Sequence, residues 1–307
     1  MLAACGCSIK RVAANSVANA LTSGEDVFAT DNDPELVRDA LPFGLKTLES
    51  LLTIVPRNRN LLLAACRGFT QYGYAFVQGD ADYIEAQDYA RAKELRQRAL
   101  KLYLRARDYG VRGLELSHPG IGRALSVTPD AAAAKLGKKD VDLLYWVAAA
   151  WGSAIGVGKD HPELMADINA VRALMNRGLV VDPDFDGGSI HEAMIVIEAA
   201  PAMMGGSMER ARAHFEQALA LSRGRRASTY VTMAENVSVQ TQNRKEFVKL
   251  LDKALAVDPD ADPPNRLANL IVQKKARWLL ERADELFIEA PTEASPTDSL
   301  PRKDTKR

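Results

Sequence analysis

The stretch that decides the fold covers residues 207–262 and reads SMERARAHFEQALALSRGRRASTYVTMAENVSVQTQNRKEFVKLLDKALAVDPDAD. It contains one apolar pattern twice. In the first copy Ala211, Phe215 and Ala218 stand four and three residues apart, and the same step begins again 36 residues later at Phe247. Residues at this spacing share one face of an α-helix. The stretch therefore predicts two helices with matching apolar faces.

A third helical pattern lies between these two copies, at Tyr230, Met233, Ala234 and Val237. The unit is thus a helix hairpin, and a single hairpin cannot bury its own apolar stripe, so hairpins must stack on one another. The second copy is followed by a proline, five residues after its last small residue. This pattern resembles the second helix of a tetratricopeptide repeat, whose period is about 34 residues. Stacking predicts a superhelix with a concave surface for ligands or partner peptides.

The same four-then-three step occurs at three earlier places in the chain. These are Gly44-Leu48-Leu51, Ala99-Tyr103-Ala106 and Val171-Met175-Gly178. The copies begin at residues 44, 99, 171, 211 and 247, so only the last two gaps approach a regular repeat. We predict an all-α, irregular tetratricopeptide-like helix-hairpin superhelix, with helices over residues 12–21, 34–55, 60–78, 82–109, 143–157, 163–179, 189–200 and 264–288.

Composition and charge limit the class of protein. The chain has 307 residues, of which 47% are hydrophobic, and 40 Lys and Arg balance 40 Asp and Glu. The balance gives no reason to expect nucleic acid or an acidic membrane surface as partner. No run reaches the length of about 18 apolar residues that a membrane-spanning helix needs. We predict a lipobox-like segment and short helix at 1–30, a helical-repeat domain at 31–288 and a disordered tail at 289–307, where proline, threonine, serine and charge replace the apolar period.

Two of the three cysteines lie in the first seven residues. Leu2-Ala3-Ala4-Cys5 resembles a bacterial lipobox, in which small residues precede a cysteine that carries lipid, so Cys5 is a candidate lipidation site. A secretory leader needs a charged segment and an apolar run before the cleavage site. We expect that residue 1 lies inside such a leader. The alternatives are a frayed alanine-rich terminus or a metal site at Cys5 and Cys7. Cys66 is predicted to be a core residue.

Two motifs resemble metal sites, and both are incomplete. The run Asp182-Pro183-Asp184-Phe185-Asp186-Gly187 begins like a calcium loop, but the closing glutamate belongs at residue 193, which is alanine. His191-Glu192 could open a zinc-protease helix, yet residue 195 is isoleucine where the second histidine is required. The sequence therefore predicts no metal, no cofactor and no catalytic set.

Two groups of residues are candidates for ligand binding. Tyr145, Trp146 and Trp151 lie on a helix that is apolar on nearly all sides, and they could line an apolar cavity or belong to the core. A second group shares one helix start, where its members could face a ligand or cap the helix. It consists of Asp186, Ser189, His191 and Glu192.

With these segments placed, the chain resembles the TRAP transporter T-component family, the TatT proteins, over roughly residues 30–288. The resemblance depends on three segments, with the lipobox-like start in the expected position. They are Tyr145-Trp146-Val147-Ala148-Ala149-Ala150-Trp151-Gly152, Asp186-Gly187-Gly188-Ser189-Ile190-His191-Glu192 and Ala211-Arg212-Ala213-His214-Phe215-Glu216. It implies a periplasmic lipoprotein of tetratricopeptide-like helix pairs, forming homotrimers with pores.

The resemblance also implies a function without catalytic residues. Such a protein associates with the substrate-binding protein of a tripartite ATP-independent periplasmic transporter. Its apolar pore or cleft would handle a hydrophobic or organic-acid ligand. Two alternatives stay open: a generic peptide-binding scaffold with cytoplasmic partners, and a metal-dependent hydrolase built on Asp186, His191 and Glu192.

Overall fold

The computed structural model describes the backbone of residues 5–22 and 26–288, and the side chains of the first helix from residue 9. Within these ranges the fold is all-α and contains no β-strand. The helices are α1 (Cys5–Thr22), α2 (Pro34–Ile54), α3 (Arg59–Tyr72), α4 (Gly79–Ile84), α5 (Tyr89–Glu115), α6 (Ile121–Val127), α7 (Pro129–Ala133), α8 (Val141–Val157), α9 (Pro162–Met165), α10 (Ile168–Val181), α11 (Ser189–Glu198), α12 (Met208–Ser222), α13 (Ala227–Met233), α14 (Arg244–Leu255), α15 (Arg266–Glu281) and α16 (Ala283–Leu286). The prediction of an all-α fold is confirmed, whereas the tetratricopeptide-like detail stays a prediction.

Several predicted helix boundaries were wrong, because turns inside the predicted ranges divide the helices. The helix expected over 82–109 is divided by a turn, and α5 begins only after Asp88, whose side chain accepts a hydrogen bond from the backbone N–H of Arg91 at 2.9 Å. The helix expected over 163–179 is likewise divided into α9 and α10. Two π-helices, η1 (Gly73–Gln78) and η5 (Ala234–Ser238), extend α3 and α13.

Four of the five predicted apolar seams are buried as expected. They are Ala99-Tyr103-Ala106 in α5, Val171-Met175-Gly178 in α10, Ala211-Phe215-Ala218 in α12 and Phe247-Leu251-Ala254 in α14. Small residues at these seams let helices approach closely. At Gly178, for example, a Cβ atom would lie 2.7 Å from the side chain of Ile190 in α11. Seams of this kind fix which helices become neighbours.

The fifth predicted seam, in α2, is only partly buried: Leu48 and Leu51 pack against the core, but the row one residue later is the more buried one. Gly44, Leu48 and Leu51 are only half-buried, whereas Leu45 and Leu52 are buried. α2 packs chiefly against α3, with α1 on the same side of the stack. A helix at the outside of the stack buries only one apolar stripe. A second apolar row can therefore stay half-exposed, and the spacing alone does not show which of the two rows is buried.

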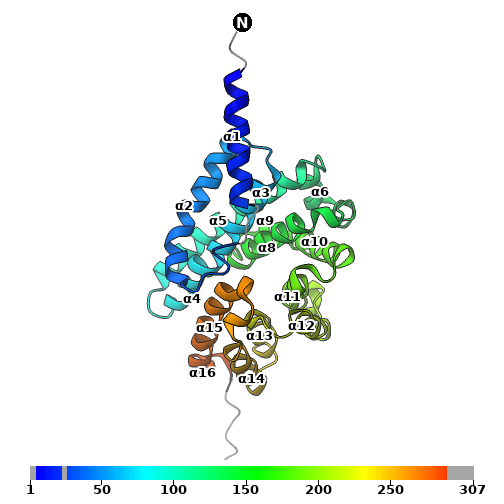
Figure 1. Ribbon diagram of the computed structural model, residues 1–307. Coiled ribbons are helices and arrows are strands. Elements are labelled where there is room, and N and C mark those ends of the chain that lie inside the picture. The colour runs from blue at the N-terminus through cyan, green and yellow to red at the C-terminus, as the bar shows by residue number, and fades with distance from the viewer. Residues whose placement is uncertain (1–4, 23–25, 289–307) are drawn as a thin grey trace, which may run out of the picture.

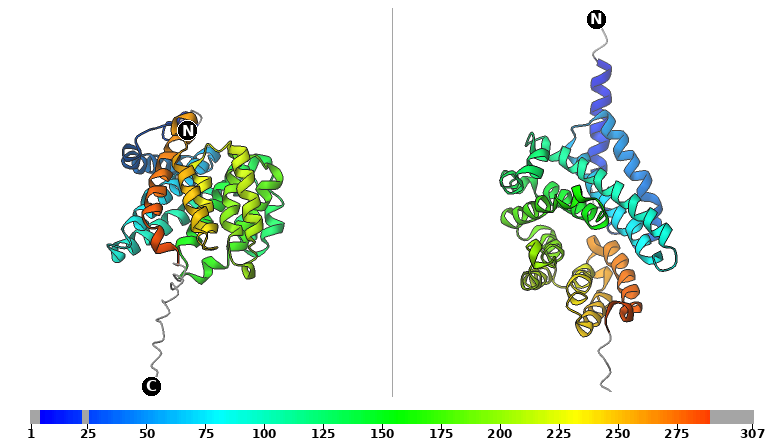
Figure 2. Two further views of the ribbon diagram at one scale, coloured as in Figure 1. Left: turned by 90° about the horizontal axis from the view of Figure 1, so that it is seen from below. Right: turned by 180° about the vertical axis from the view of Figure 1, so that it is seen from behind.

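The helices follow one another along a curved stack that closes on itself (Figures 1 and 2). α15 returns to the first part of the chain, where the backbone N–H of Leu267 donates a hydrogen bond to the carbonyl of Ala29 at 3.1 Å. Trp278 of α15 also packs edge-on against Tyr83 of α4, with ring centroids 5.3 Å apart. The inner faces of distant helices consequently lie near one another.

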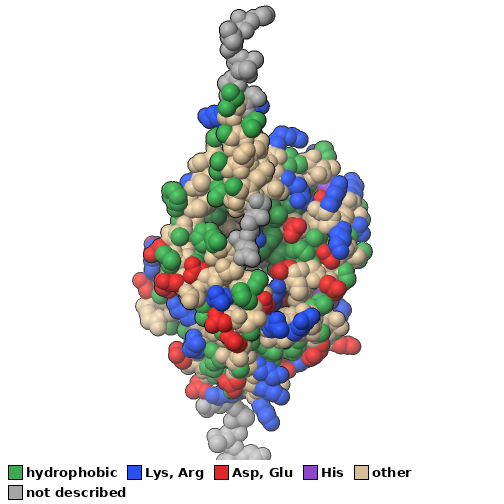
Figure 3. Space-filling view, in the orientation of Figure 1, with side chains coloured by type: hydrophobic (Ala, Val, Ile, Leu, Met, Phe, Trp, Pro, Cys, Tyr) green, Lys and Arg blue, Asp and Glu red, His purple; other side chains and the backbone are tan. Residues whose placement is uncertain are grey.

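The outer surface has mixed charge, as the composition predicts. In Figure 3, acidic and basic side chains are interspersed over the body of the molecule. Among the described helices, none combines the length and the apolar character required to cross a bilayer.

Candidate functional site

A sharp turn positions the start of α11, where the second group of candidate residues lies. Asp186, Gly187 and Gly188 have φ angles of 45°, 58° and 99°, all in the left-handed region. At Gly188 a Cβ atom would also lie 3.1 Å from the Cα atom of Ala218 in α12. Glycine adopts this backbone without steric cost. The turn therefore depends on Gly188, and it holds Asp186 and the first turn of α11 close to α12.

Arg226, immediately before α13, is the centre of the site. Its Nη2 atom lies 3.0 Å from Oδ1 of Asp186, and its Nη1 atom donates a hydrogen bond to the hydroxyl of Ser189. Ser189 in turn donates to Oδ2 of Asp186 at 2.6 Å. The Arg226 side chain is 11% exposed and that of Asp186 is 58% exposed. The group thus joins a buried cation to a carboxylate that reaches solvent.

Glu192 lies one turn further along α11 and faces α13. Its Oε2 atom accepts hydrogen bonds from the hydroxyls of Ser228 at 2.9 Å and Thr229 at 2.8 Å. Burial raises the pKa of Glu192, against the opposing effect of these hydrogen bonds and of Arg226. In the described part of the chain, no Lys, Arg or His nitrogen lies within 4.0 Å of its carboxylate. Among the described residues, the two hydroxyl groups are thus the hydrogen-bond donors to this half-buried carboxylate.

Tyr145 of α8 borders the same cluster. Its ring lies 5.1 Å from that of Trp146 and 5.2 Å from that of Phe185, measured between centroids. Burial, followed by the charges of Glu192 and Asp186, raises the pKa of the Tyr145 hydroxyl. Three aromatic rings consequently stand beside the acidic groups, and two of them belong to the first group of candidate residues.

Trp151 lies elsewhere, in the core. It is 3% exposed, its Nε1 atom donates to Oδ2 of Asp167 at 3.2 Å, and the guanidinium of Arg107 lies 5.3 Å from its ring. These contacts bind α8 to α5 and to the start of α10. Trp151 has little free surface to offer a ligand.

His191 also points away from the cluster, toward α12. Its Nδ1 atom lies 2.8 Å from Nδ1 of His214, so one ring donates a hydrogen bond to the other. Burial lowers the pKa of both histidines, and for His214 the neighbouring His191 adds to the effect. The four candidates at the start of α11 are thus divided: Asp186, Ser189 and Glu192 meet near Arg226, whereas His191 joins a helix contact.

The sequence reasoning missed Arg226, Ser228 and Thr229. The sequence did indicate that such partners exist, because Asp186 and Glu192 lie at the start of a buried helix, where carboxylates need hydrogen-bond donors. The basic turn Arg223-Gly224-Arg225-Arg226 contains such a donor, Arg226. Nothing in the sequence placed this turn opposite α11.

A second polar cluster lies where α15 meets the first part of the chain. The Nζ atom of Lys275 lies 2.9 Å from Oε2 of Glu235 in η5 and 5.6 Å from the ring centroid of Tyr74 in η1. Against the lowering effect of Lys275, burial and the carboxylates of Glu235, Glu192 and Asp82 raise the pKa of Tyr74. Tyr74 is therefore within electrostatic range of both clusters, and both π-helices contribute to the second one, as is common at functional sites.

The structure describes the region of the two metal-like motifs and Cys66, but not the side chain of the candidate lipidation residue. Within residues 5–22 and 26–288, no three His, Cys, Asp or Glu side chains gather closely enough to hold a metal ion. Cys66 is fully buried, as predicted. The side chain of Cys5 lies outside the described residues, and so does the segment 289–307, so the predictions for them stay predictions.

Comparison with known proteins gives consistent results. Residues 30–287 match the family described as "TRAP transporter T-component". A protein of Treponema pallidum (strain Nichols), described as an uncharacterized protein, is 31% identical over 303 residues, which cover 92% of this chain and 94% of the relative. The match extends over nearly all of the helical body, and we conclude that the chain belongs to the TRAP transporter T-component family.

Proposed function

We propose that the protein is a non-enzymatic accessory component that binds the substrate-binding protein of its transporter and receives a small ligand. Membership of the family makes the chain an accessory component of a TRAP transporter. The finer statement adds two binding activities, one for a protein and one for a small molecule. Residues 31–288 form the single helical domain that carries both.

The observation that supports a ligand site is the meeting of Asp186, Ser189, Glu192 and Tyr145 around Arg226. These residues come from η3 (Phe185–Gly188), α11, α8 and the start of α13, which the packing of the helices brings together. Polar groups that converge beside aromatic rings are typical of small-molecule sites. The ligand would lie with its polar part on the cluster and its apolar part on Tyr145 and Trp146.

Location and assembly complete the proposal. We expect the protein in the periplasm, held to a membrane through lipid on Cys5, and assembled as a homotrimer. An extracytoplasmic position is required for contact with a periplasmic substrate-binding protein. Analytical ultracentrifugation of the purified protein tests the trimer, and mass spectrometry of the protein from membranes tests the lipid.

Co-purification tests the central claim. The tagged chain is expected to retain the substrate-binding protein of the same transporter. Arg226→Ala is expected to retain it as well, but to weaken the transfer of ligand between the two proteins. Arg225→Ala is the matched control, because Arg225 is the exposed neighbour on the same turn. Failure of the intact chain to retain the substrate-binding protein would contradict the proposal.

A generic protein-interaction scaffold is the second candidate. The observation in its favour is the exposed apolar surface of α2, where Phe43 is 79% and Leu36 is 59% exposed. Large exposed apolar residues often mark protein contacts. This candidate predicts that Phe43→Ala abolishes partner binding and that Arg226→Ala has no effect on any function, which separates it from the first.

A further inference from the structure

Glu192 differs from the other carboxylates of the two polar clusters in having no cationic partner. The other three each form an ion pair with an Arg or Lys side chain. The pairs are Asp186 with Arg226 at 3.0 Å, Glu235 with Lys275 at 2.9 Å and Asp82 with Arg96 at 3.3 Å. Glu192 is therefore the one carboxylate of these four without an ion pair, although the charge of Arg226 acts on it from farther away.

The free side of this carboxylate is open to a further donor. Ser228 and Thr229 both bond to Oε2. Oε1 accepts no hydrogen bond from the described residues, and it is not among the atoms that are both buried and unpartnered. A polar atom that is neither bonded nor enclosed can bind a donor from solution.

The surroundings of Glu192 combine acidic and aromatic groups. The hydroxyl of Tyr145 feels the charge of Glu192, and the Tyr145 ring packs against the rings of Trp146 and Phe185. Tyr74, whose side chain is 45% exposed, feels the charge of Glu192 from the other cluster. Arg226 also faces Glu192, but its guanidinium is already bonded to Asp186 and Ser189.

We propose that Glu192 binds the ammonium group of a cationic organic ligand, whose apolar part lies on the neighbouring aromatic rings. This inference rests on the proposed function and deepens it by naming the ligand class. An ammonium group offers hydrogen-bond donors and a positive charge, so it complements a carboxylate that has one unbonded oxygen and no ion-pair partner. Aromatic faces attract cations as well.

Three probes of similar size and different charge test the inference: benzylammonium, benzyl alcohol and benzoate. Their binding to the full chain is measured by ligand-observed NMR titration at neutral pH and low salt. We expect benzylammonium to bind about tenfold or more tightly than benzoate, as a charge-assisted hydrogen bond implies. Glu192→Gln should remove this preference and leave benzyl alcohol unchanged.

Two further variants separate a binding role from a structural one. Glu192→Asp keeps the negative charge and should keep the preference for benzylammonium. A variant that had lost its fold would lose that preference. Glu216→Gln, at an exposed position of α12, should behave like the wild type. Circular dichroism confirms that each variant is folded.

Three results would overturn the inference: tighter binding of benzoate, no effect of Glu192→Gln, or no binding of any probe. None of these affects the retention of the substrate-binding protein in the co-purification experiment. If retention fails while benzylammonium still binds through Glu192, the proposed function falls and the ligand site stands. The two claims can thus fail separately.

Discussion

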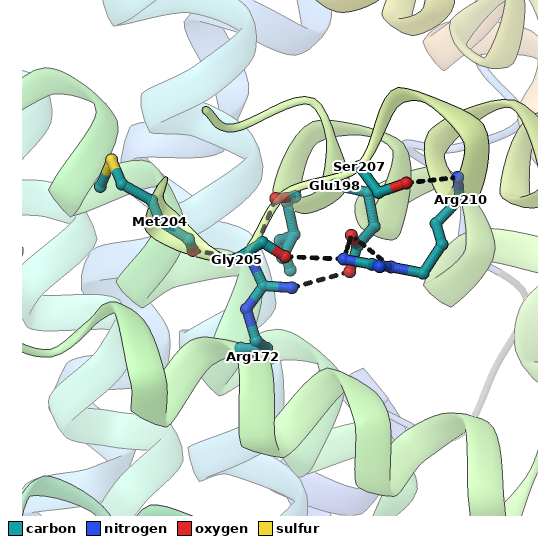
Figure 4. A network of polar contacts seen from close by, with 7 residues as sticks. Arg172, Glu198, Met204, Gly205, Ser207 and Arg210 are labelled. Carbon is teal, nitrogen blue, oxygen red and sulfur yellow. Dashed lines mark hydrogen bonds and ion pairs between the residues drawn. The ribbon is translucent and has the colours of Figure 1, made fainter. Parts of the chain in front are cut away.

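Two glutamates on α11 have opposite environments although only six residues separate them. Glu198, at the end of the helix, is 4% exposed and binds two arginines: Nη1 of Arg172 lies 2.7 Å from Oε1, and Nη2 of Arg210 lies 2.6 Å from Oε2 (Figure 4). Glu192, near the start, has hydroxyl partners only. Glu198 is buried and Glu192 is half-buried, but only Glu198 forms ion pairs.

The region around Glu198 is bonded in several directions. Arg210 donates a hydrogen bond to the carbonyl of Gly205 at 2.7 Å, and the backbone N–H of Ser207 donates to the carbonyl of Glu198 at 2.7 Å (Figure 4). Ser207 also caps α12 through its hydroxyl. The network joins α10, α11 and α12 through the loop 199–207, so its role is structural.

The difference shows how to distinguish a structural carboxylate from a candidate binding residue. A buried carboxylate with two arginine partners stabilises the packing of the helices that it joins. Its removal leaves those arginines without a counter-charge. A half-buried charge with an open oxygen costs stability, and a ligand would offset that cost.

Removal of the Glu198 carboxylate should give the largest loss. In Glu198→Ala, Arg172 and Arg210 lose their shared partner, and we expect about 3 kcal/mol of lost stability, at the lower end of the range for broken buried pairs because Arg210 is half-exposed. Urea unfolding measures it. Glu216→Ala, on the exposed face of α12, is the control. Equal effects of the two changes would show that the network is not structural.

Gly206 tests how tightly the loop beside Glu198 is packed. A Cβ atom there would lie 1.8 Å from the carbonyl oxygen of Ala200, so Gly206→Ala must displace backbone. We expect a loss of about 2 kcal/mol, within the range for overpacking. At Gly44 in α2, nothing lies within 4 Å of the added atom, so Gly44→Ala should instead stabilise the helix by about 0.5–1 kcal/mol. Thermal unfolding that ranks the variants in the reverse order would contradict this account.

The pair His191 and His214 joins α11 to α12, and it should weaken this contact in acid. Burial lowers the pKa of both rings, so the unfolded chain binds protons more readily and stability falls as the pH drops through the histidine range. Asp184 opposes the shift at His191, and at His214 Glu198 opposes it while Arg210 adds to it.

The test of this pair is urea unfolding between pH 8 and pH 5. His214→Gln should lose less stability than the wild type over that interval, by less than about 1 kcal/mol, because both rings are half-exposed. His161→Gln, at an exposed ring, should follow the wild type. If the unfolding free energy of His214→Gln depends on pH as strongly as that of the wild type, the two rings do not affect stability.

The smallest effect is expected at Glu192, and it has the opposite sign. Burial raises the pKa of Glu192, so ionisation disfavours the folded state as the pH rises through that raised pKa. Arg226 opposes the shift and Asp186 adds to it. We expect Glu192→Gln to be about 0.5 kcal/mol more stable than the wild type at pH 8, with the difference disappearing in acid. Lower stability of the variant at pH 8 would place Glu192 with Glu198, as a structural residue.

The apolar seams could be predicted because they depend on local spacing. Ala99-Tyr103-Ala106 and its three later counterparts are buried where the four-then-three step put them. The seam at Gly44 could not be assigned correctly, because an outer helix tolerates two apolar rows and only its neighbours decide which row is buried. The candidate site was half visible: Asp186, Ser189, Glu192 and Tyr145 were identified, whereas Arg226 was not.

The sequence by itself determined the all-α class, the four buried seams, the family resemblance and the acidic start of α11, because each depends on residues that are close together in the chain. The tertiary structure alone decided which of these residues meet. Arg226 comes 40 residues after Asp186, and Lys275 faces Tyr74 across the closure of the stack. The physical reason is that spacing fixes a side chain's direction on its own helix, while the partner it finds depends on how successive helices turn and pack.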